Sequence, residues 1–210
     1  MTATADQPAA SAATPADDRS AVYVPRPSAL WLLIGGVLGL AASLTLTVEK
    51  IALLIDPAYV PTCSLNPVLA CGSVMVSWQA SVFGFPNPLI GIVAFTVVTV
   101  TGVISVGGVR LPRWYWSGLA MGSLLGTIFV HWLIFQSLYR IGALCPYCMV
   151  VWSVTIPTFV VATAITLRPL GAHPAARLLY QWRWSLVTFW FVGVVLLALV
   201  RFWDYWSTLI

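Results

Sequence analysis

The chain has 210 residues, of which 60% are hydrophobic and only 8% charged, and its formal net charge is +4. Soluble domains carry roughly 25% charged residues, so this composition excludes an ordinary water-soluble globule and predicts a bilayer protein. The ten basic residues are scattered between apolar blocks. That scatter excludes the clustered basic face of a nucleic-acid-binding protein.

The first 28 residues differ from the rest of the chain. They are rich in Ala, Thr, Ser, Pro and Asp. Such a segment buries too little apolar surface to offset the entropy of ordering, so we predict that residues 1–28 are a disordered tail. No basic segment leads directly into a short apolar stretch, as it does in a cleavable signal peptide.

Five apolar blocks follow, each near the length of about 20 residues that crosses a bilayer as a helix. We therefore expect residues 29–210 to form an all-α integral membrane domain with five transmembrane helices. The blocks run from Leu30 to Val48, Pro88 to Val109, Trp114 to Tyr139, Pro146 to Leu167, and Trp184 to Val200.

Glycines recur at four-residue spacing in two of these blocks. Gly35 and Gly39 lie in the first, and Gly118, Gly122 and Gly126 lie in the third. Small residues at this spacing let helix backbones approach closely. We predict close helix contacts at the three-glycine stripe.

The basic residues between the blocks predict the orientation. With the N-terminus in the cytoplasm, seven of them lie inside and only Lys50, Arg140 and Arg201 lie outside, as the positive-inside rule requires. Loop 49–87 and the turn from Arg140 to Cys145 then face outward. We expect a multi-pass protein of the cell inner (plasma) membrane whose four cysteines lie on the extracytoplasmic side, where disulfides persist.

A CxxC motif, Cys145-Pro-Tyr-Cys148, opens the fourth block. Proline suits the first helical position, which puts Cys145 near the N-cap and Cys148 in the first turn. The partial positive charge of a helix N-terminus stabilises the nucleophilic thiolate. The motif favours a redox-active pair over a structural disulfide, whose small ring would constrain little chain entropy.

The other two cysteines, Cys63 and Cys71, lie in the outward loop. Four cysteines permit three pairings, and the sequence does not choose among them. The outer pair is compatible with a relay that passes electrons to the CxxC pair, or with a fixed loop staple. A zinc site is disfavoured because it needs four ligands, usually from two closely spaced pairs, so we expect no metal.

Three further features have alternative interpretations. Val74, Met75, Trp78, Val82 and Phe83 share one side at helical spacing, which fits an interfacial helix over the bundle mouth or an ordinary apolar loop. Asn87, between two prolines, fits a turn or a hydrogen-bond donor to a carbonyl. His131, within the third block, fits a proton relay or a neutral histidine bonded to a neighbouring helix.

Together these motifs resemble the vitamin K epoxide reductase family, and its bacterial members in particular. The resemblance covers residues 30–167 and rests on Cys63, Cys71, the following SWQASVFGFPNPLIG and the later CxxC. It implies a bundle of four transmembrane helices surrounding a quinone, to which the fifth block adds a helix.

The resemblance also implies roles for individual residues. Cys145 and Cys148 would be the catalytic pair, with Cys148 facing the quinone. Cys63 would exchange with a partner, and Cys71 would pass electrons to Cys145. Asn87 matches an asparagine that binds a quinone oxygen.

Two aromatic residues complete the predicted cofactor site. Trp152 stands where animal members have a tyrosine near the quinone, and an indole only donates a hydrogen bond, which favours quinone reduction over epoxide reduction. Trp78, in the segment over the bundle mouth, is the other candidate quinone contact.

We therefore expect a thiol:quinone oxidoreductase that reoxidises a separate thioredoxin-fold (DsbA-like) protein and reduces menaquinone or ubiquinone, supporting disulfide formation in exported proteins. The alternatives are a quinone epoxide reductase that uses external dithiols and a non-enzymatic scaffold stapled by its cysteines.

Overall fold

The structure, a computed structural model, describes residues 21–168 and 174–208. Ordered secondary structure begins at Ala21, earlier than the predicted boundary of the tail at residue 28, whereas residues 1–20 lie outside the described part. The reason is a short antiparallel pairing in which β1 (Ala21–Val22) lies against β2 (Leu111–Pro112). The Arg168 side chain also donates a hydrogen bond to the carbonyl oxygen of Tyr23 (3.1 Å).

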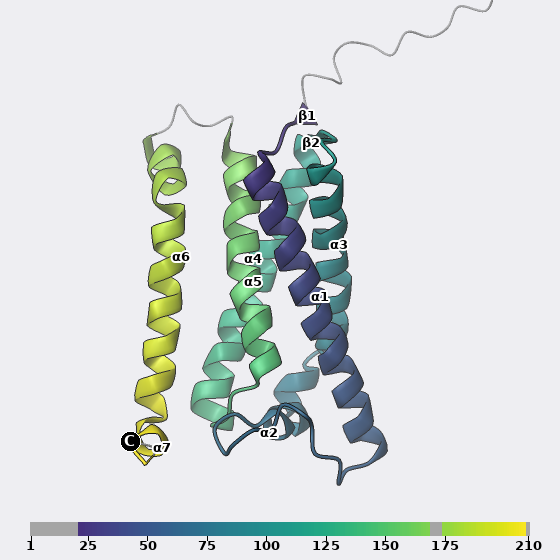
Figure 1. The fold of residues 1–210 in the computed structure, drawn as a ribbon, viewed down its shortest axis with the longest axis vertical. Helices are drawn as coiled ribbons and strands as arrows, with labels where there is room; N and C mark the ends of the chain where they lie inside the picture. Colours follow the sequence, from purple (N-terminus) through teal and green to yellow (C-terminus); the bar gives the residue numbers. More distant parts are fainter. Residues whose placement is uncertain (1–20, 169–173, 209–210) are drawn as a thin grey trace, which may run out of the picture.

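Helices account for nearly all of the remaining structure (Figure 1). Five are long and apolar enough to cross a membrane, which confirms the all-α membrane fold. The long helices are α1 (Arg26–Ile55), α3 (Pro88–Val106), α4 (Arg113–Gln136), α5 (Pro146–Leu167) and α6 (Pro174–Arg201). The short ones are α2 (Cys71–Val76), η2 (Trp78–Ser81), the π-helical turn η3 (Ser137–Ile141) and α7 (Trp203–Trp206).

Prolines and glycines set several helix boundaries. Proline occupies the first turn of α1, α3 and α5, where the absent N–H removes no intrahelical bond. The first helix ends at Ile55 because Asp56 precedes a proline and adopts an extended conformation. After α3, Gly108 takes a φ of +80°, which turns the chain toward β2.

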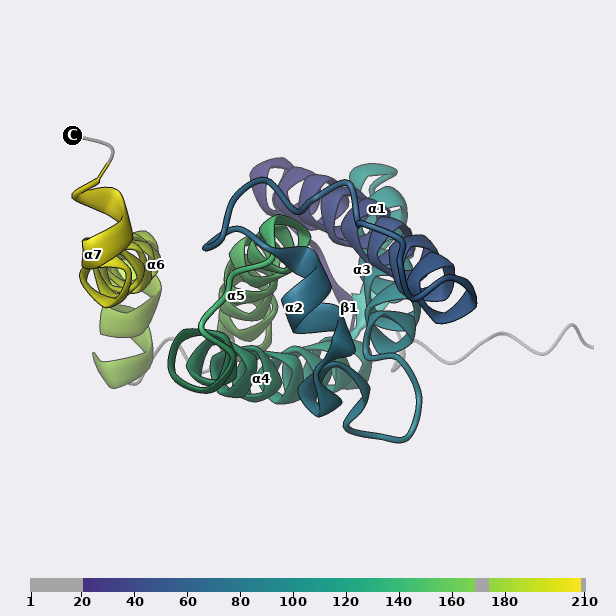
Figure 2. The same ribbon diagram turned by 90° about the horizontal axis from the view of Figure 1, so that it is seen from below.

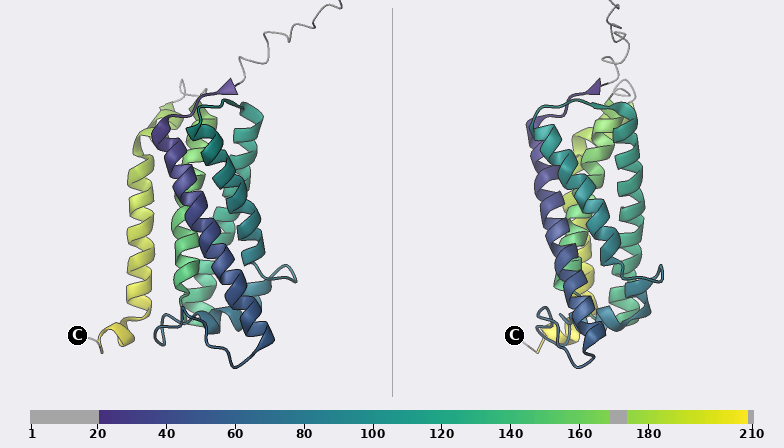
Figure 3. Two further views of the ribbon diagram at one scale, coloured as in Figure 1. Left: turned by 45° about the vertical axis from the view of Figure 1, so that its right-hand side comes forward. Right: turned by 90° about the vertical axis from the view of Figure 1, so that its right-hand side faces the viewer.

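The four helices α1, α3, α4 and α5 surround a common axis, and α6 stands outside them (Figure 2). The loop after α1 and helix α2 cover one end of the bundle, and the β1–β2 pairing lies at the other end (Figure 3). Below, these are called the loop end and the strand end.

The first helix is longer than its predicted apolar block and includes Glu49 and Lys50, both buried. Their polar atoms are satisfied by the loop. Glu49 accepts hydrogen bonds from the Tyr59 hydroxyl (3.0 Å) and from the backbone N–H of Thr62 (3.3 Å). Lys50 donates to the carbonyl oxygen of Met75 (2.5 Å). These bonds explain how two charged residues extend an apolar helix.

Close helix packing occurs at a different place from the predicted one. A Cβ on Gly36 would come within 2.6 Å of the backbone nitrogen of Thr99, and one on Gly39 would overlap the Phe95 ring. A Cβ on Gly118 or Gly122 would meet nothing within 4 Å. At Gly126 a Cβ would come within 3.7 Å of the Thr155 side chain, an ordinary contact with α5. The close contacts predicted for the three-glycine stripe are therefore wrong at Gly118 and Gly122, which line a cavity.

Candidate redox site

The CxxC motif, Cys145 to Cys148, occupies the N-terminus of α5, as predicted. Cys145 is the N-cap residue in an extended conformation, and Cys148 lies in the first turn. Cys145 is only 1% exposed. A hydrogen bond from the Cys148 thiol lowers the pKa of Cys145, although burial opposes this effect, and the backbone N–H groups of Cys148 and Tyr147 lower it further. The arrangement favours a thiolate at Cys145.

The two loop cysteines form a disulfide with each other, which selects one of the three possible pairings. Cys63 and Cys71 are joined with a Cα–Cα distance of 5.6 Å, while Cys145 and Cys148 are free thiols. Cys63 is 5% exposed and Cys71 is fully buried. The structure therefore represents a state with an oxidised outer pair and a reduced inner pair.

The two pairs meet at Cys71 and Cys145. Their sulfur atoms lie 3.1 Å apart. Thiol–disulfide exchange proceeds by attack of a thiolate on a disulfide sulfur, and this contact brings the two reacting atoms together. Residues 74 positions apart in the chain thus form a potential exchange path between the loop and the membrane helix.

A backbone bridge explains why these two sulfurs meet. Leu69 and Leu144 pair as parallel extended residues. The N–H of Leu144 donates to the oxygen of Val68 (2.8 Å), and the N–H of Ala70 donates to the oxygen of Leu144 (3.0 Å). Each bridge residue lies one or two positions before a cysteine, so the pairing sets Cys71 beside Cys145. Sequence reasoning missed this bridge.

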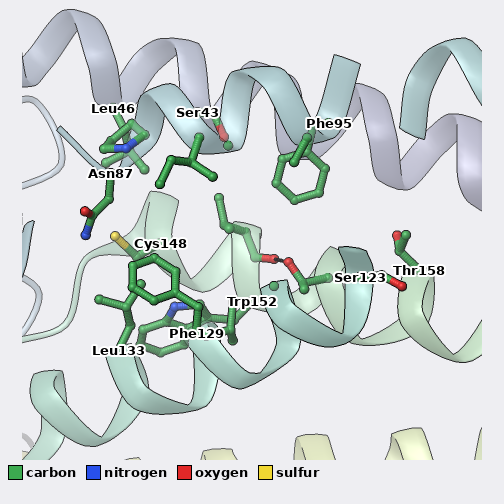
Figure 4. A pocket seen from close by; sticks show the side chains of 18 of the residues that line it. Ser43, Leu46, Asn87, Phe95, Ser123, Phe129, Leu133, Cys148, Trp152 and Thr158 are labelled. Atoms are coloured by element: carbon green, nitrogen blue, oxygen red, sulfur yellow. Dashed lines mark hydrogen bonds between the residues drawn. The ribbon is translucent and has the colours of Figure 1, made fainter. Parts of the chain in front are cut away.

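Below the contact between Cys71 and Cys145 lies a cavity of about 530 Å³ inside the four-helix bundle. Cys148 lines it, and in Figure 4 its sulfur points into the cavity on the side of Asn87. Thr158 also lines it, ten residues farther along α5, so the cavity extends roughly 15 Å along the bundle axis. None of the described residues that line it is charged, which suits a neutral apolar molecule.

Two of the three predicted cofactor contacts line this cavity. Trp152 is 4% exposed and packs with Val130 and Ile134 of α4. Asn87 uses its side chain to organise the loop: its Nδ2 donates to the Gln79 oxygen (2.7 Å) and its Oδ1 accepts from the Val82 N–H (3.2 Å). Because an amide nitrogen carries two hydrogens, one donor remains for a ligand.

Trp78 is not brought to the cavity. Its ring is 67% exposed and packs edge-on against Trp132 on the outside of α4, with centroids 5.9 Å apart. The physical reason is an extended residue, Ser77, which separates α2 from η2 and interrupts the helical spacing on which the prediction depended.

The segment over the bundle mouth therefore combines both interpretations. Helix α2 covers the mouth and contributes Val74 and Met75 to the cavity lining (Figure 2). Beyond Ser77 the chain turns outward, although the buried Gln79 still lines the cavity and bonds to Gln136 of α4 (3.3 Å).

His131 bonds to a neighbouring helix, which confirms the second of its two interpretations. Its Nε2 accepts a hydrogen bond from the Trp190 indole N–H of α6 (2.7 Å). Its Nδ1 then donates to the backbone carbonyl oxygen of Thr127 (2.8 Å). The two bonds together require a neutral ring, and His131 is not among the described residues that line the cavity.

The sulfurs of Cys63, Cys71 and Cys145 lie within 4.8 Å of one another, a distance that metal ligands also show. Two of the three are joined in a disulfide and therefore are not thiolates, which are the form that binds metals. The cluster in this redox state consists of one disulfide and one thiol in contact with it.

Comparison with known proteins agrees with this geometry. No curated protein matches the chain closely, whereas residues 30–163 match the vitamin K epoxide reductase family. That family comprises helical membrane proteins associated with thiol–disulfide oxidoreduction and with quinones. With five helices able to span a membrane and the matched region covering more than half of its length, the chain belongs to the vitamin K epoxide reductase family.

Proposed function

We propose that this protein is a thiol:quinone oxidoreductase that reoxidises a separate thioredoxin-fold (DsbA-like) protein and reduces a membrane quinone, menaquinone or ubiquinone. The net result is disulfide formation in exported proteins. One observation carries the proposal: Cys71 touches Cys145 at 3.1 Å, and Cys148 of the same CxxC pair lines an apolar cavity.

The path begins at the loop. A thiolate of the reduced partner attacks Cys63, and Cys71 leaves as a thiolate. The second partner thiol then displaces Cys63, so that the partner departs with its disulfide and both loop cysteines are reduced. The buried Cys63 requires the segment before it to move during this step, because the Tyr59 and Thr62 bonds to Glu49 hold that segment in place.

The electrons then pass inward. Cys71 attacks Cys145 of the oxidised inner pair and releases Cys148. When Cys63 displaces Cys145, the loop disulfide forms again and the inner pair is left as a dithiol, which is the state in this structure. Oxidation of this dithiol supplies two electrons and two protons, which convert one quinone to one quinol.

Several features of the cavity fit a quinone substrate. A quinone ring is neutral and apolar, and no charged side chain is found among the described lining residues. The free amide hydrogen of Asn87 provides a donor for a ring oxygen. Trp152 supplies a buried aromatic face within the same cavity. The length of the cavity and its mostly apolar lining also suit a long apolar tail.

The proposed location follows from the arginines. Arg26, Arg110, Arg113 and Arg168 lie at the strand end, and the cysteines lie at the loop end. The positive-inside rule then puts the strand end in the cytoplasm and the cysteines on the extracytoplasmic side of the inner membrane. Residues 29–210 would act as one membrane domain preceded by a cytoplasmic tail.

The decisive test supplies the purified protein with a reduced thioredoxin-fold protein and either menaquinone or ubiquinone, and follows quinone absorbance. We expect turnover with at least one quinone and a loss of at least about a thousandfold in Cys148→Ser, because the group that faces the acceptor is removed. Trp78→Phe, outside the cavity, is the matched control. Turnover that survives in Cys148→Ser, or reduction of a quinone epoxide in preference to both quinones, would contradict the proposal.

A further inference from the structure

A second cavity of about 520 Å³ lies between α5 and α6, away from the redox site. The two helices run side by side along it (Figure 1). Three arginines line it, Arg168 of the α5 C-terminus and Arg177 and Arg183 of α6. No acidic residue is present among the described residues around this cavity.

The chain builds this cavity from two helix faces. Arg177, Tyr180, Arg183 and Leu186 follow one another at three-residue spacing, so each side chain neighbours the next along the surface of α6. The wall from α5 is mostly apolar and consists of Phe159, Val160, Thr163, Ala164 and Leu167. The cavity is therefore basic near the strand end, where α5 ends, and apolar toward the middle of the two helices.

Two of the arginines are held in position by the protein. The Arg183 guanidinium lies 4.0 Å from the centroid of the Tyr180 ring. It also donates to the backbone carbonyl oxygen of Tyr180 (2.5 Å). Arg168 donates to the Tyr23 oxygen (3.1 Å). A guanidinium has five N–H donors, so each arginine retains several for an anion.

The wall from α5 also contains one buried hydroxyl. Thr163 lines the cavity, and its Oγ1 has no hydrogen-bond partner among the described residues. Because this oxygen is not accessible from the cavity, Thr163 presents its apolar atoms there, and the wall from α5 is apolar up to Arg168.

We propose that this cavity binds an anionic phospholipid of the leaflet at the strand end. Its phosphate pairs with Arg177 and Arg183, and an acyl chain follows the apolar α5 wall. Basic pockets between transmembrane helices on the cytoplasmic side suit such headgroups. Both helices of the site are candidate membrane spans, so lipid is the anion with direct access to the apolar depth.

The test uses the full-length protein, delipidated in a neutral detergent, and native mass spectrometry with dioleoylphosphatidylglycerol or dioleoylphosphatidylcholine. We expect stronger binding of the anionic lipid. The variant R177Q/R183Q should bind it at least about tenfold more weakly. The matched control R110Q/R113Q removes the same charge at the same end but outside the cavity, and it should bind as the unaltered protein does.

Several results would overturn the proposal. Equal affinity for the two lipids, or equal losses in both double variants, would show that the arginines do not form a specific site. Complete displacement of the lipid by inorganic phosphate would show that the apolar wall contributes nothing. If phosphatidylglycerol binds only after residues 2–20 are deleted, the acidic N-terminal segment with Asp17 and Asp18 is the occupant instead.

Discussion

The bundle of α1, α3, α4 and α5, called the four-helix unit below, is built differently from α6, although all five helices are apolar enough to span a membrane. Inside the unit, α1 and α3 approach until Gly36 and Gly39 leave no room for a side chain. The same unit encloses the uncharged cavity that Cys148 lines. Together with the segments that join its helices, the unit also contains the family-matched region, residues 30–163.

Helix α6 lies outside this unit (Figure 2) and is joined to it by apolar packing, to which Val194 and Ala198 contribute, and by a few polar contacts. Trp190 donates to His131, and the Arg201 side chain donates to the Leu138 oxygen (3.0 Å). A cavity of similar volume between α5 and α6 is lined by three arginines rather than by a thiol. The comparison teaches that the four cysteines and the uncharged cavity belong to the four-helix unit and its covering loop, while α6 packs against the outside of the unit.

The strongest test of the four-helix unit is the exchange contact itself. In Cys63→Ser/Cys148→Ser, Cys71 and Cys145 are the only cysteines left, and their sulfurs lie 3.1 Å apart. We expect a nearly complete Cys71–Cys145 disulfide under mild oxidation and no quinone reduction. Non-reducing peptide mass mapping detects the bond. Two free thiols, in a protein that unfolds as the unaltered chain does, would rule out Cys71–Cys145 exchange.

The second test fills the inner cavity. Gly122 lines it, and a Cβ at that position meets nothing within 4 Å, so Gly122→Leu should fold while it occupies space meant for the quinone. Crowding a binding site costs about 1–3 kcal/mol, so the KM for quinone should rise about tenfold or more. Kinetics at varied quinone concentration measure this effect.

The matched control is Gly193→Leu on α6, where a Cβ also meets nothing within 4 Å. It should leave both the KM and the unfolding temperature unchanged. An equal rise in KM for both variants would break the distinction between the four-helix unit and α6, because the effect would then not come from the inner cavity.

Much of this unit could be predicted from the sequence. The CxxC motif with Pro146 predicts a helix that begins at the motif, and α5 begins at that proline. Apolar length predicts all five membrane helices. The sequence predicts that the outward loop begins at Glu49, whereas the bonds of Glu49 and Lys50 to Tyr59, Thr62 and Met75 keep both residues in α1.

The features that were not predicted depend on contacts between distant segments. Spacing alone allowed three cysteine pairings, and the Leu69–Leu144 bridge that sets Cys71 beside Cys145 uses backbone atoms, which carry no residue signature. Gly118 and Gly122 follow the same pattern as Gly35 and Gly39, yet one stripe lines a cavity and the other lies in the close-packed face of α1. Likewise, the extended conformation of the single residue Ser77 places Trp78 on the outside of α4, away from the cavity.

A subtler test concerns acid–base chemistry within the unit. The Cys148 thiol donates to Cys145 and is the largest cause of its lowered pKa. With the loop disulfide intact, Cys145 is the only thiol left in Cys148→Ser and in Cys148→Ala. Serine keeps a donor and alanine does not, so the pKa of Cys145 should be higher in Cys148→Ala.

The direction of the pH effect follows from this shift. A lowered pKa means that the Cys145 thiolate persists as the pH falls below the range of an ordinary thiol, and it is lost only when the pH passes the folded-state pKa. Ultraviolet thiolate absorbance across a pH titration measures this transition. Identical curves for the serine and alanine variants would show that the side chain at position 148 does not control the pKa of Cys145.

The smallest expected effect lies at the junction with α6. Trp190→Phe keeps the aromatic packing but removes the N–H that donates to His131, leaving Nε2 without that bond. Interhelical hydrogen bonds in membranes contribute about 0.6 kcal/mol on average, so the unfolding free energy should fall by about that amount. Because His131 does not line the inner cavity, quinone turnover should be unchanged in Trp190→Phe and in His131→Ala. A loss of turnover in both variants, with stability unchanged, would show that His131 takes part in quinone reduction and that α6 contributes directly to the chemistry.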